Sequence, residues 1–93
     1  MKEVLLTLEI VGTWEHEPPG YRIFINDEMI CERAFYAMEY EMYNESMLLS
    51  LEPGKEYNFI FEQITSVFNR NRLSYKNLQL DGKPVRPTFT VSN

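Results

Sequence analysis

Apolar and polar residues alternate with a period of two along most of this 93-residue chain. In the first such run, Glu3, Thr7 and Glu9 occupy one phase of the alternation. The opposite phase is entirely apolar and consists of Val4, Leu6, Leu8 and Ile10. Successive side chains of a strand point to opposite faces, so this run predicts a strand with one buried face.

The same alternation returns further along the chain, in each case next to residues that form turns. Segment 21–36 predicts a hairpin that turns at the sequence NDE. Segment 47–64 predicts a second hairpin, which turns at residues 52–55 (EPGK). The last segment, 73–92, predicts two strands that are joined at residues 81–82 (DG).

Residues 36–43 (YAMEYEMY) fit two structures. Tyrosine and methionine alternate with alanine and glutamate, which is typical of a strand, whereas alanine, methionine and glutamate also suit a short helix. The regularity of the alternation favours the strand. In a strand, Glu39, Glu41 and Glu45 would form an acidic stripe, which is expected to be a solvated face that discourages edge-to-edge pairing.

These elements add up to about seven short strands at roughly 8–12-residue spacing, which predicts an all-β fold. The expected architecture is an antiparallel β-sandwich of jelly-roll or immunoglobulin-like type. No linker, repeat or low-complexity tract divides the sequence, so residues 1–93 are expected to form a single domain. Pro84 and Pro87 lack the backbone donor that a central ladder needs, so the last strand is expected either to lie at a sheet edge or to be frayed at its start.

Charge, hydropathy and cysteine content indicate the expected cellular location of the chain and the classes of partner it is expected to bind. The formal net charge of −5 argues against a broad nucleic-acid-binding surface, because the phosphate backbone would be repelled. Glu9 interrupts the first apolar run, so the start does not resemble a signal peptide, and no segment has the roughly 20 apolar residues of a membrane span. Cys31 is the only cysteine, so no internal disulfide can form. The chain is therefore expected in the cytoplasm, or in a particle such as a virion that is released from it.

Two segments carry a family resemblance. The sequence YRIFINDEMICE (residues 21–32) is similar to a hairpin of small carbohydrate-binding β-sandwiches. The segment FNRNRLSYKNLQLDGKPV (residues 68–85) resembles the closing segment of calcium-dependent xylan-binding modules, which implies a β-sandwich that binds a polysaccharide. The matched positions are Asn71, Arg72, Leu73, Leu78, Leu80 and Gly82. In general character, the chain is also similar to the compact acidic β-sandwich proteins that decorate phage heads and tails.

In the xylan-binding family, the polar loop before the last two strands supplies side chains to a calcium ion, which in turn binds sugar hydroxyls. The resemblance therefore implies Asn69 and Asn71 as the residues nearest to such an ion. The neighbouring aspartates of the family pattern are missing here, and Arg70 and Arg72 bring positive charge where a hard cation binds carboxylates. The residues therefore predict no metal and no cofactor, and the family resemblance leaves a bound calcium ion as the alternative.

Residues with ligand-binding chemistry lie in two loops. An exposed Trp14 would stack on a sugar ring, and the alternative is that its indole packs in the core or against its own loop. Arg70 and Arg72 alternate, so in an extended chain both point to one side and would bind a carboxylate or phosphate. The alternative for this loop is a solvated crossover between two strands. The expected ligand-binding residues are Trp14, Asn69, Arg70, Asn71 and Arg72.

No set of residues predicts catalysis. Glu15, His16 and Glu17 are consecutive, and neighbours in an extended chain point in opposite directions, so a solvated acidic loop is expected rather than a metal site. His16 is the only histidine in the chain. Cys31 lies in an alternating strand and is expected to be a small buried hydrophobe. The chain is therefore expected not to be an enzyme.

The chain has more apolar residues than the two inward-facing sheet surfaces of a sandwich require. Residues on the opposite phase of their strands or in loops are Leu5, Val11, Phe24, Leu48, Ile60 and Val67. Exposed apolar patches usually mark interfaces, so an oligomer or a partner protein is expected on the face that bears Phe24 and Ile60, unless strand curvature or long loops cover both phases.

The leading hypothesis is a non-enzymatic binding or assembly module, such as a structural or decorating subunit of a virion. The alternative is a lectin-like module that uses Trp14 and the 68–72 loop.

Overall fold

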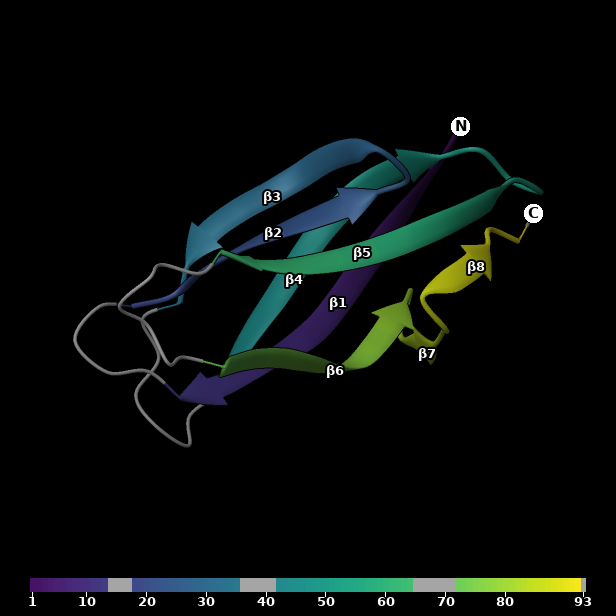
Figure 1. Cartoon of the computed structure of the whole chain (residues 1–93). Helices are drawn as coiled ribbons and strands as arrows, with labels where there is room; N and C mark the ends of the chain where they lie inside the picture. Colours follow the sequence, from purple (N-terminus) through teal and green to yellow (C-terminus); the bar gives the residue numbers. More distant parts are fainter. Residues whose placement is uncertain (14–17, 36–41, 65–71, 93) are drawn as a thin grey trace.

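Two four-stranded antiparallel sheets pack against each other in the computed structural model of the chain (Figure 1). The structure describes residues 1–13, 18–35, 42–64 and 72–92. The strands are β1 (Lys2–Thr13), β2 (Gly20–Ile25), β3 (Glu28–Ala34), β4 (Met42–Leu51), β5 (Glu56–Ile64), β6 (Arg72–Leu80), β7 (Lys83–Pro84) and β8 (Thr88–Thr90). The predicted all-β antiparallel sandwich is therefore confirmed, with two of its strands only two and three residues long.

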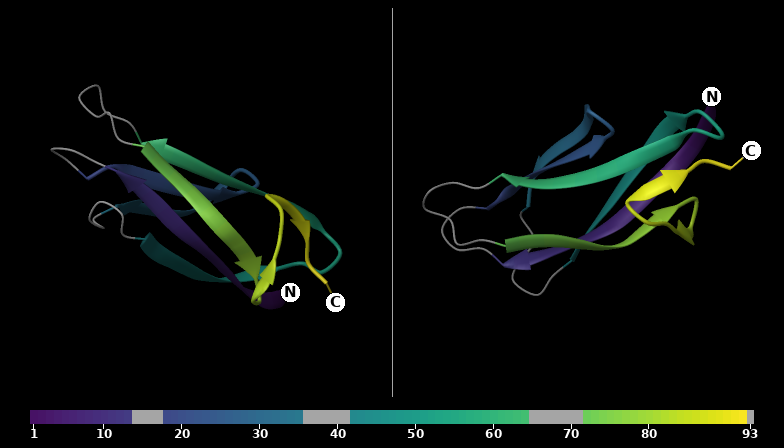
Figure 2. Two further views of the ribbon diagram at one scale, coloured as in Figure 1. Left: turned by 90° about the horizontal axis from the view of Figure 1, so that it is seen from below. Right: turned by 45° about the vertical axis from the view of Figure 1, so that its right-hand side comes forward.

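The positions of the strands in the two sheets resemble those of an immunoglobulin sandwich, whereas the order in which the chain visits them does not. One sheet has the order β4-β1-β6-β7 and the other β3-β2-β5-β8, and Figure 2 shows the two layers from two further directions. In an immunoglobulin sandwich, strand B lies between strands A and E, and a G-F-C-C′ sheet faces it. The series β6-β1-β4 and β8-β5-β2-β3 occupy these places. Because β6 follows β5 in the chain but stands in the place of strand A, the connectivity differs from that of an immunoglobulin domain.

From Val4 to Ile10, every second residue of β1 is buried between the sheets. The buried residues are Val4, Leu6, Leu8 and Ile10, each at most 2% exposed, as the alternation predicts. The facing sheet contributes Tyr21, Ile23, Ile25, Tyr57, Phe59 and Phe89 to the same core. Burying a large apolar side chain stabilises a fold by about 1.5–3 kcal/mol, so this shared core holds the two sheets together.

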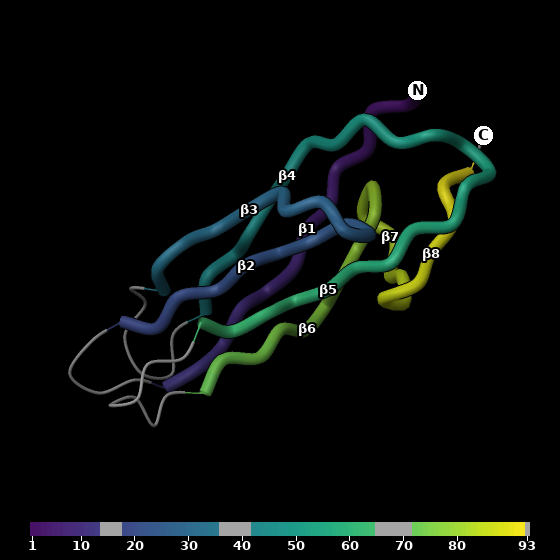
Figure 3. The backbone as a smooth tube through the Cα atoms, turned by 45° about the horizontal axis from the view of Figure 1, so that its top comes forward, coloured from purple at the N-terminus to yellow at the C-terminus, as the bar shows by residue number. Residues whose placement is uncertain are grey.

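The second predicted hairpin, over residues 47–64, is wrong. β4 pairs with β1, whereas β5 pairs with β2 and β8, so the two strands belong to different sheets (Figure 3). The turn itself lies where expected: Gly54 has a φ of 83°, and its amide donates to the Val91 carbonyl at 2.9 Å. The Glu52 amide donates to the Tyr57 hydroxyl at 2.8 Å. Turn chemistry is local in sequence, but the choice of a partner strand is not, and this is why the prediction failed.

The other two predicted turns are confirmed. Asn26, with a φ of 55°, joins β2 to β3. Asp81 and Gly82, with φ values of 51° and 80°, join β6 to β7 as a two-residue hairpin loop requires. Among the described strands β8 pairs only with β5, so the last strand lies at a sheet edge as its prolines predict. Residues 36–41, for which the sequence fits a strand or a helix, lie outside the described residues.

Candidate functional site

The structure describes only Arg72 among the predicted ligand-binding residues. The predicted residues that lie outside the described ranges are Trp14, Glu15, His16, Glu17, Glu39, Glu41, Val67, Asn69, Arg70 and Asn71. Arg72 is exposed and is the first residue of β6, where its Cα partner in β1 is Thr13. Trp14 follows Thr13 directly in the sequence, and Asn71 precedes Arg72. The two segments of the predicted ligand site are therefore attached to paired strand ends.

The predicted interface residues, Phe24 and Ile60, lie side by side on the outer face of the β3-β2-β5-β8 sheet. Phe24 in β2 is the Cα partner of Ile60 in β5 and also of Met29 in β3. Ile60 is 46% exposed, Met29 is 49% exposed, and Phe24 is partly exposed. Phe24, Ile60 and Met29 thus form an apolar row across three strands, which we call the Phe24 row.

Polar groups bound the Phe24 row on both sides. Along the strands in one direction, Nε of Arg22 lies 3.1 Å from Oε2 of Glu32, and its Nη1 lies 3.3 Å from Oε1 of Glu62. In the other direction, the backbone amide of Asn58 donates a hydrogen bond to Oδ1 of Asn26 at 2.9 Å. An apolar centre with a polar rim is the usual anatomy of a protein–protein interface.

A smaller exposed apolar pair lies on the outer face of the other sheet. Leu5 in β1 and Leu48 in β4 are Cα partners and are 40% and 66% exposed. Val11, further along β1, is partly exposed and pairs with the exposed Met42. Among the described residues, neither strand curvature nor loops cover the outward apolar phase of these strands.

A buried carboxylate links the two sheets on the side where β3 and β4 are the edge strands. Glu45 in β4 is 2% exposed, and its Oε2 accepts a hydrogen bond from the Tyr21 hydroxyl at 2.6 Å. The same oxygen lies 2.9 Å from Nε of Arg33 and 3.9 Å from Sγ of Cys31. The prediction that Glu45 lies on a solvated acidic stripe is therefore wrong.

The position of Glu45 in the alternation explains this error. Its Cα partner is Leu8, so it lies on the inward phase of β4 together with Met47, Leu49 and Leu51. Counting back from these three apolar residues is the signal that could have identified Glu45 as inward-facing. The sequence offers no comparable signal for the hydroxyl and guanidinium groups that satisfy the carboxylate, because they come from two other strands.

The surroundings of Glu45 keep the neighbouring tyrosine and cysteine protonated. Burial, followed by the hydrogen bond to Glu45, raises the pKa of Tyr21 above its ordinary range. Burial also raises the pKa of the half-buried Cys31, and the Glu45 carboxylate adds to this rise against the opposing effect of Arg33. A nucleophilic cysteine needs a lowered pKa, so the arrangement suits a structural contact between sheets rather than thiol chemistry.

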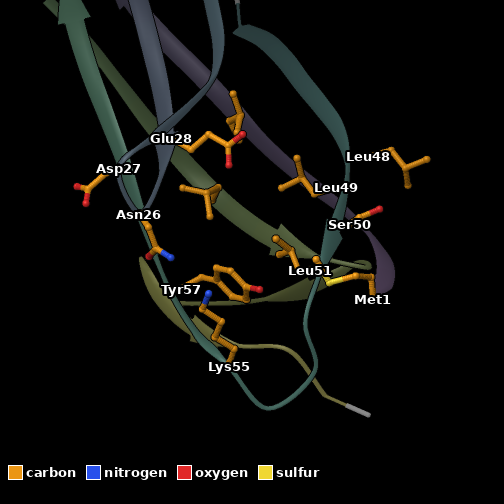
Figure 4. Close-up of a pocket in the computed structure, with 12 residues that line it drawn as sticks. Met1, Asn26, Asp27, Glu28, Leu48, Leu49, Ser50, Leu51, Lys55 and Tyr57 are labelled. Atoms are coloured by element: carbon orange, nitrogen blue, oxygen red, sulfur yellow. The ribbon is translucent and has the colours of Figure 1, made fainter.

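A groove of about 810 Å³ lies between the β2–β3 turn and the C-terminal half of β4 (Figure 4). The apolar residues of its lining are Met1, Ile25, Ile30, Leu48, Leu49, Leu51 and Tyr57. In Figure 4 Leu49 points into the opening, Leu48 points away from it, and the Glu28 carboxylate enters from the hairpin side. The sequence did not predict this groove, because its two walls belong to different sheets.

Among the described residues, no group of three or more histidine, cysteine, aspartate or glutamate side chains is placed to hold a metal ion. The described segments also contain no helix with the length and hydrophobicity needed to cross a membrane. Comparison of the chain with known protein families, with curated proteins and with solved structures finds no match. Function is therefore inferred from three features: the exposed apolar residues on the two outer faces, the pairing of Thr13 with Arg72, and the groove.

Proposed function

We propose that this protein is a non-enzymatic binding or assembly module that docks on a protein surface through the Phe24 row. The observation that carries the proposal is the exposed alignment of Met29, Phe24 and Ile60 across three neighbouring strands. Aromatic and large aliphatic side chains at the centre of a polar-rimmed patch contribute most of the binding free energy in protein interfaces.

Within this class, the chain suits the role of a structural or decorating subunit of a larger particle. The Phe24 row lies on the outer face of one sheet, and the Leu5–Leu48 pair lies on the outer face of the other. A subunit with a neighbour on each side uses two such surfaces, whereas a free-standing binder needs only one. Stable co-purification with a symmetric assembly is the result expected for such a subunit.

Replacing Ile60 by serine is expected to weaken the association of the chain by about fivefold or more, because a central apolar side chain of an interface contributes more than about 1 kcal/mol. Phe24→Ser is expected to act in the same direction. Sedimentation velocity at micromolar concentration, with the chain alone and with its purified assembly, measures the change in size.

Leu5→Ser tests the proposed second surface, since it removes an exposed leucine from the opposite outer face. Lys76→Ser is the control, because it changes an exposed residue of β6 that belongs to neither apolar surface. If only Leu5→Ser dissociates the assembly, the Phe24 row is not the interface. A wild-type chain that stays monomeric in both samples, with a size unchanged by Ile60→Ser, would contradict the proposal as a whole.

A carbohydrate-binding module is the second candidate, favoured by the pairing of Thr13 with Arg72. This pairing makes Trp14 and the polar loop that ends at Asn71 continue from adjacent strand ends. An indole that stacks on a sugar ring, beside guanidinium and amide groups that donate hydrogen bonds, is a chemistry suited to a polysaccharide.

For this second candidate, Trp14→Ala and Arg72→Ala are each expected to lower affinity for a glycan by about fivefold, since a stacking or charge-assisted contact contributes about 1 kcal/mol. A glycan array identifies the sugar, and titration of the variants gives the affinities. Lys83→Ala is the control, because it removes an exposed cation from the far end of the β6–β7 hairpin. Absence of glycan binding by the wild-type chain would exclude this candidate.

A further inference from the structure

The sheet edges differ in how well they are protected against pairing with another strand. Among the described strands the four edges are β3, β4, β7 and β8. β7 has two residues and includes Pro84, and β8 has three residues and closely follows Pro87. β3 carries the exposed charges of Glu28 and Glu32 and has a register shift against β2. Short length, proline, charge and irregular register are the features that block edge-to-edge association.

β4 lacks these features over its C-terminal half. The strand has ten residues without proline, and its register with β1 is unbroken. Its one charged residue, Glu45, points inward and is paired with Arg33, so the stretch from Ser46 to Leu51 carries no charge. No described strand pairs with the outer edge of β4. A free, regular and uncharged edge of this kind is a template for an added strand.

The groove lies along the same half of β4. Leu48 to Leu51 span about 10 Å of extended chain, a length over which an added strand directs about two side chains to one face. Leu49 and Leu51 line the groove on the β4 side, and Ile30 and Tyr57 line it from the other sheet. A volume of about 810 Å³ has room for several apolar side chains, so an added strand would find an apolar space beneath it.

The groove lining carries charges of both signs: Asp27 and Glu28 lie at the β2–β3 turn, whereas Lys55 lines the groove next to Tyr57. A cation on an occupant is therefore favoured at the end of the groove that lies beside the turn. The exposed Glu28 points into the opening, and the exposed Asp27 stands next to it in the β2–β3 turn (Figure 4). The whole chain carries a formal net charge of −5. A second copy of the chain would add negative charge, and its β4 has no lysine or arginine to offer to Glu28.

We propose that β4 and the adjacent groove accept an extended segment of another protein, with apolar residues at every second position and a lysine or arginine that pairs with Glu28. The segment joins the sheet as a strand beside β4. Backbone hydrogen bonds to the free edge supply affinity, and the inward side chains that contact Leu49 and Leu51 supply selectivity. This site is separate from the Phe24 row, which lies on the outer face of the other sheet.

The test uses the full chain and a short synthetic peptide in which valine alternates with threonine between two terminal lysines. Saturable amide shifts are expected along the C-terminal half of β4 and at Glu28, together with slower hydrogen exchange of the β4 amides. A peptide with proline in place of the central valine is expected to bind about fivefold more weakly or worse, because it loses a backbone donor.

Three variants locate the site on the protein. Leu49→Ser removes an apolar group from the groove and is expected to weaken peptide binding. Leu5→Ser changes an exposed leucine of β1 that does not line the groove, so it should leave peptide binding unchanged. Glu28→Lys changes an exposed residue at the start of β3. It is expected to weaken binding of the lysine peptide by about threefold and to strengthen binding of a peptide with terminal glutamates.

The proposal is overturned if the peptide causes no shifts up to about 1 mM, if the proline peptide binds equally well, or if the shifts map away from β4. Shifts at β4 that depend on protein concentration without peptide would place a second copy at this edge instead. Ile60→Ser should leave peptide binding unchanged, so a failure of the Phe24 interface and a failure of this site give different results.

Discussion

Leu6→Ala is expected to lower the free energy of unfolding by about 3 kcal/mol, because it leaves a cavity in a core that closes only partly around it. Leu6 is 0% exposed and lies in the middle of β1, between the two sheets. A domain of this size has a total stability of only about 5–10 kcal/mol, so the loss is a large fraction of it. Equilibrium unfolding in urea, followed by circular dichroism, measures the change.

The adjacent Leu5 provides the matched control for this prediction. It has the same side chain in the same strand but lies on the outer face and is 40% exposed. Leu5→Ala is expected to lower the free energy of unfolding by only about 1 kcal/mol, since the side chain is already 40% exposed and its removal leaves no enclosed cavity in the core. A one-residue slip of the register would exchange the two faces, so a larger loss for Leu5→Ala would contradict the register of β1.

Arg33→Met is expected to lower the free energy of unfolding by about 2 kcal/mol. The substitution leaves the Glu45 carboxylate buried without its cation, and breaking a buried pair in this way is costly. The Arg33 side chain itself is half-exposed, so water reaches the pair from one side and the loss is at the lower end for such pairs. Thermal and urea unfolding of the variant measure it.

Arg22→Met is the matched control for Arg33. Arg22 also contacts carboxylates, those of Glu32 and Glu62, but all the side chains involved are at least 39% exposed, so a much smaller loss is expected. Equal losses for the two arginines would mean that burial of Glu45 does not matter.

Combined variants test whether the stability at this position depends on satisfying the charge of Glu45 and the hydroxyl of Tyr21. Arg33→Met with Glu45→Leu removes both charges but leaves the Tyr21 hydroxyl buried without an acceptor, which costs about 1–2 kcal/mol. Adding Tyr21→Phe removes this orphaned group, and the triple variant is expected to recover stability close to that of the wild type. A triple variant less stable than Arg33→Met would show that shape, rather than charge satisfaction, dominates at this position.

The candidate sites differ in how many of their residues the sequence predicts. Phe24 and Ile60 were identified as outward-facing from the alternation alone, and the structure adds that they are cross-strand neighbours with Met29. The groove beside β4 had no signal in the sequence, because its lining residues become neighbours only when two sheets pack. Most of the predicted ligand loop lies outside the described residues, so its role stays a prediction.

The sequence by itself determined which side chains of β1, β2 and β5 face the core and where the chain turns. Both properties depend on residues within a few positions of one another: the period of two sorts Val4 from Leu5, and Asp81-Gly82 adopts the positive φ angles of its turn. Tertiary structure alone decided which strands pair, since β4 and β5 adjoin in the chain yet enter different sheets. It also decided the burial of Glu45, because a carboxylate tolerates burial only when donors such as Tyr21 arrive from distant segments to satisfy it.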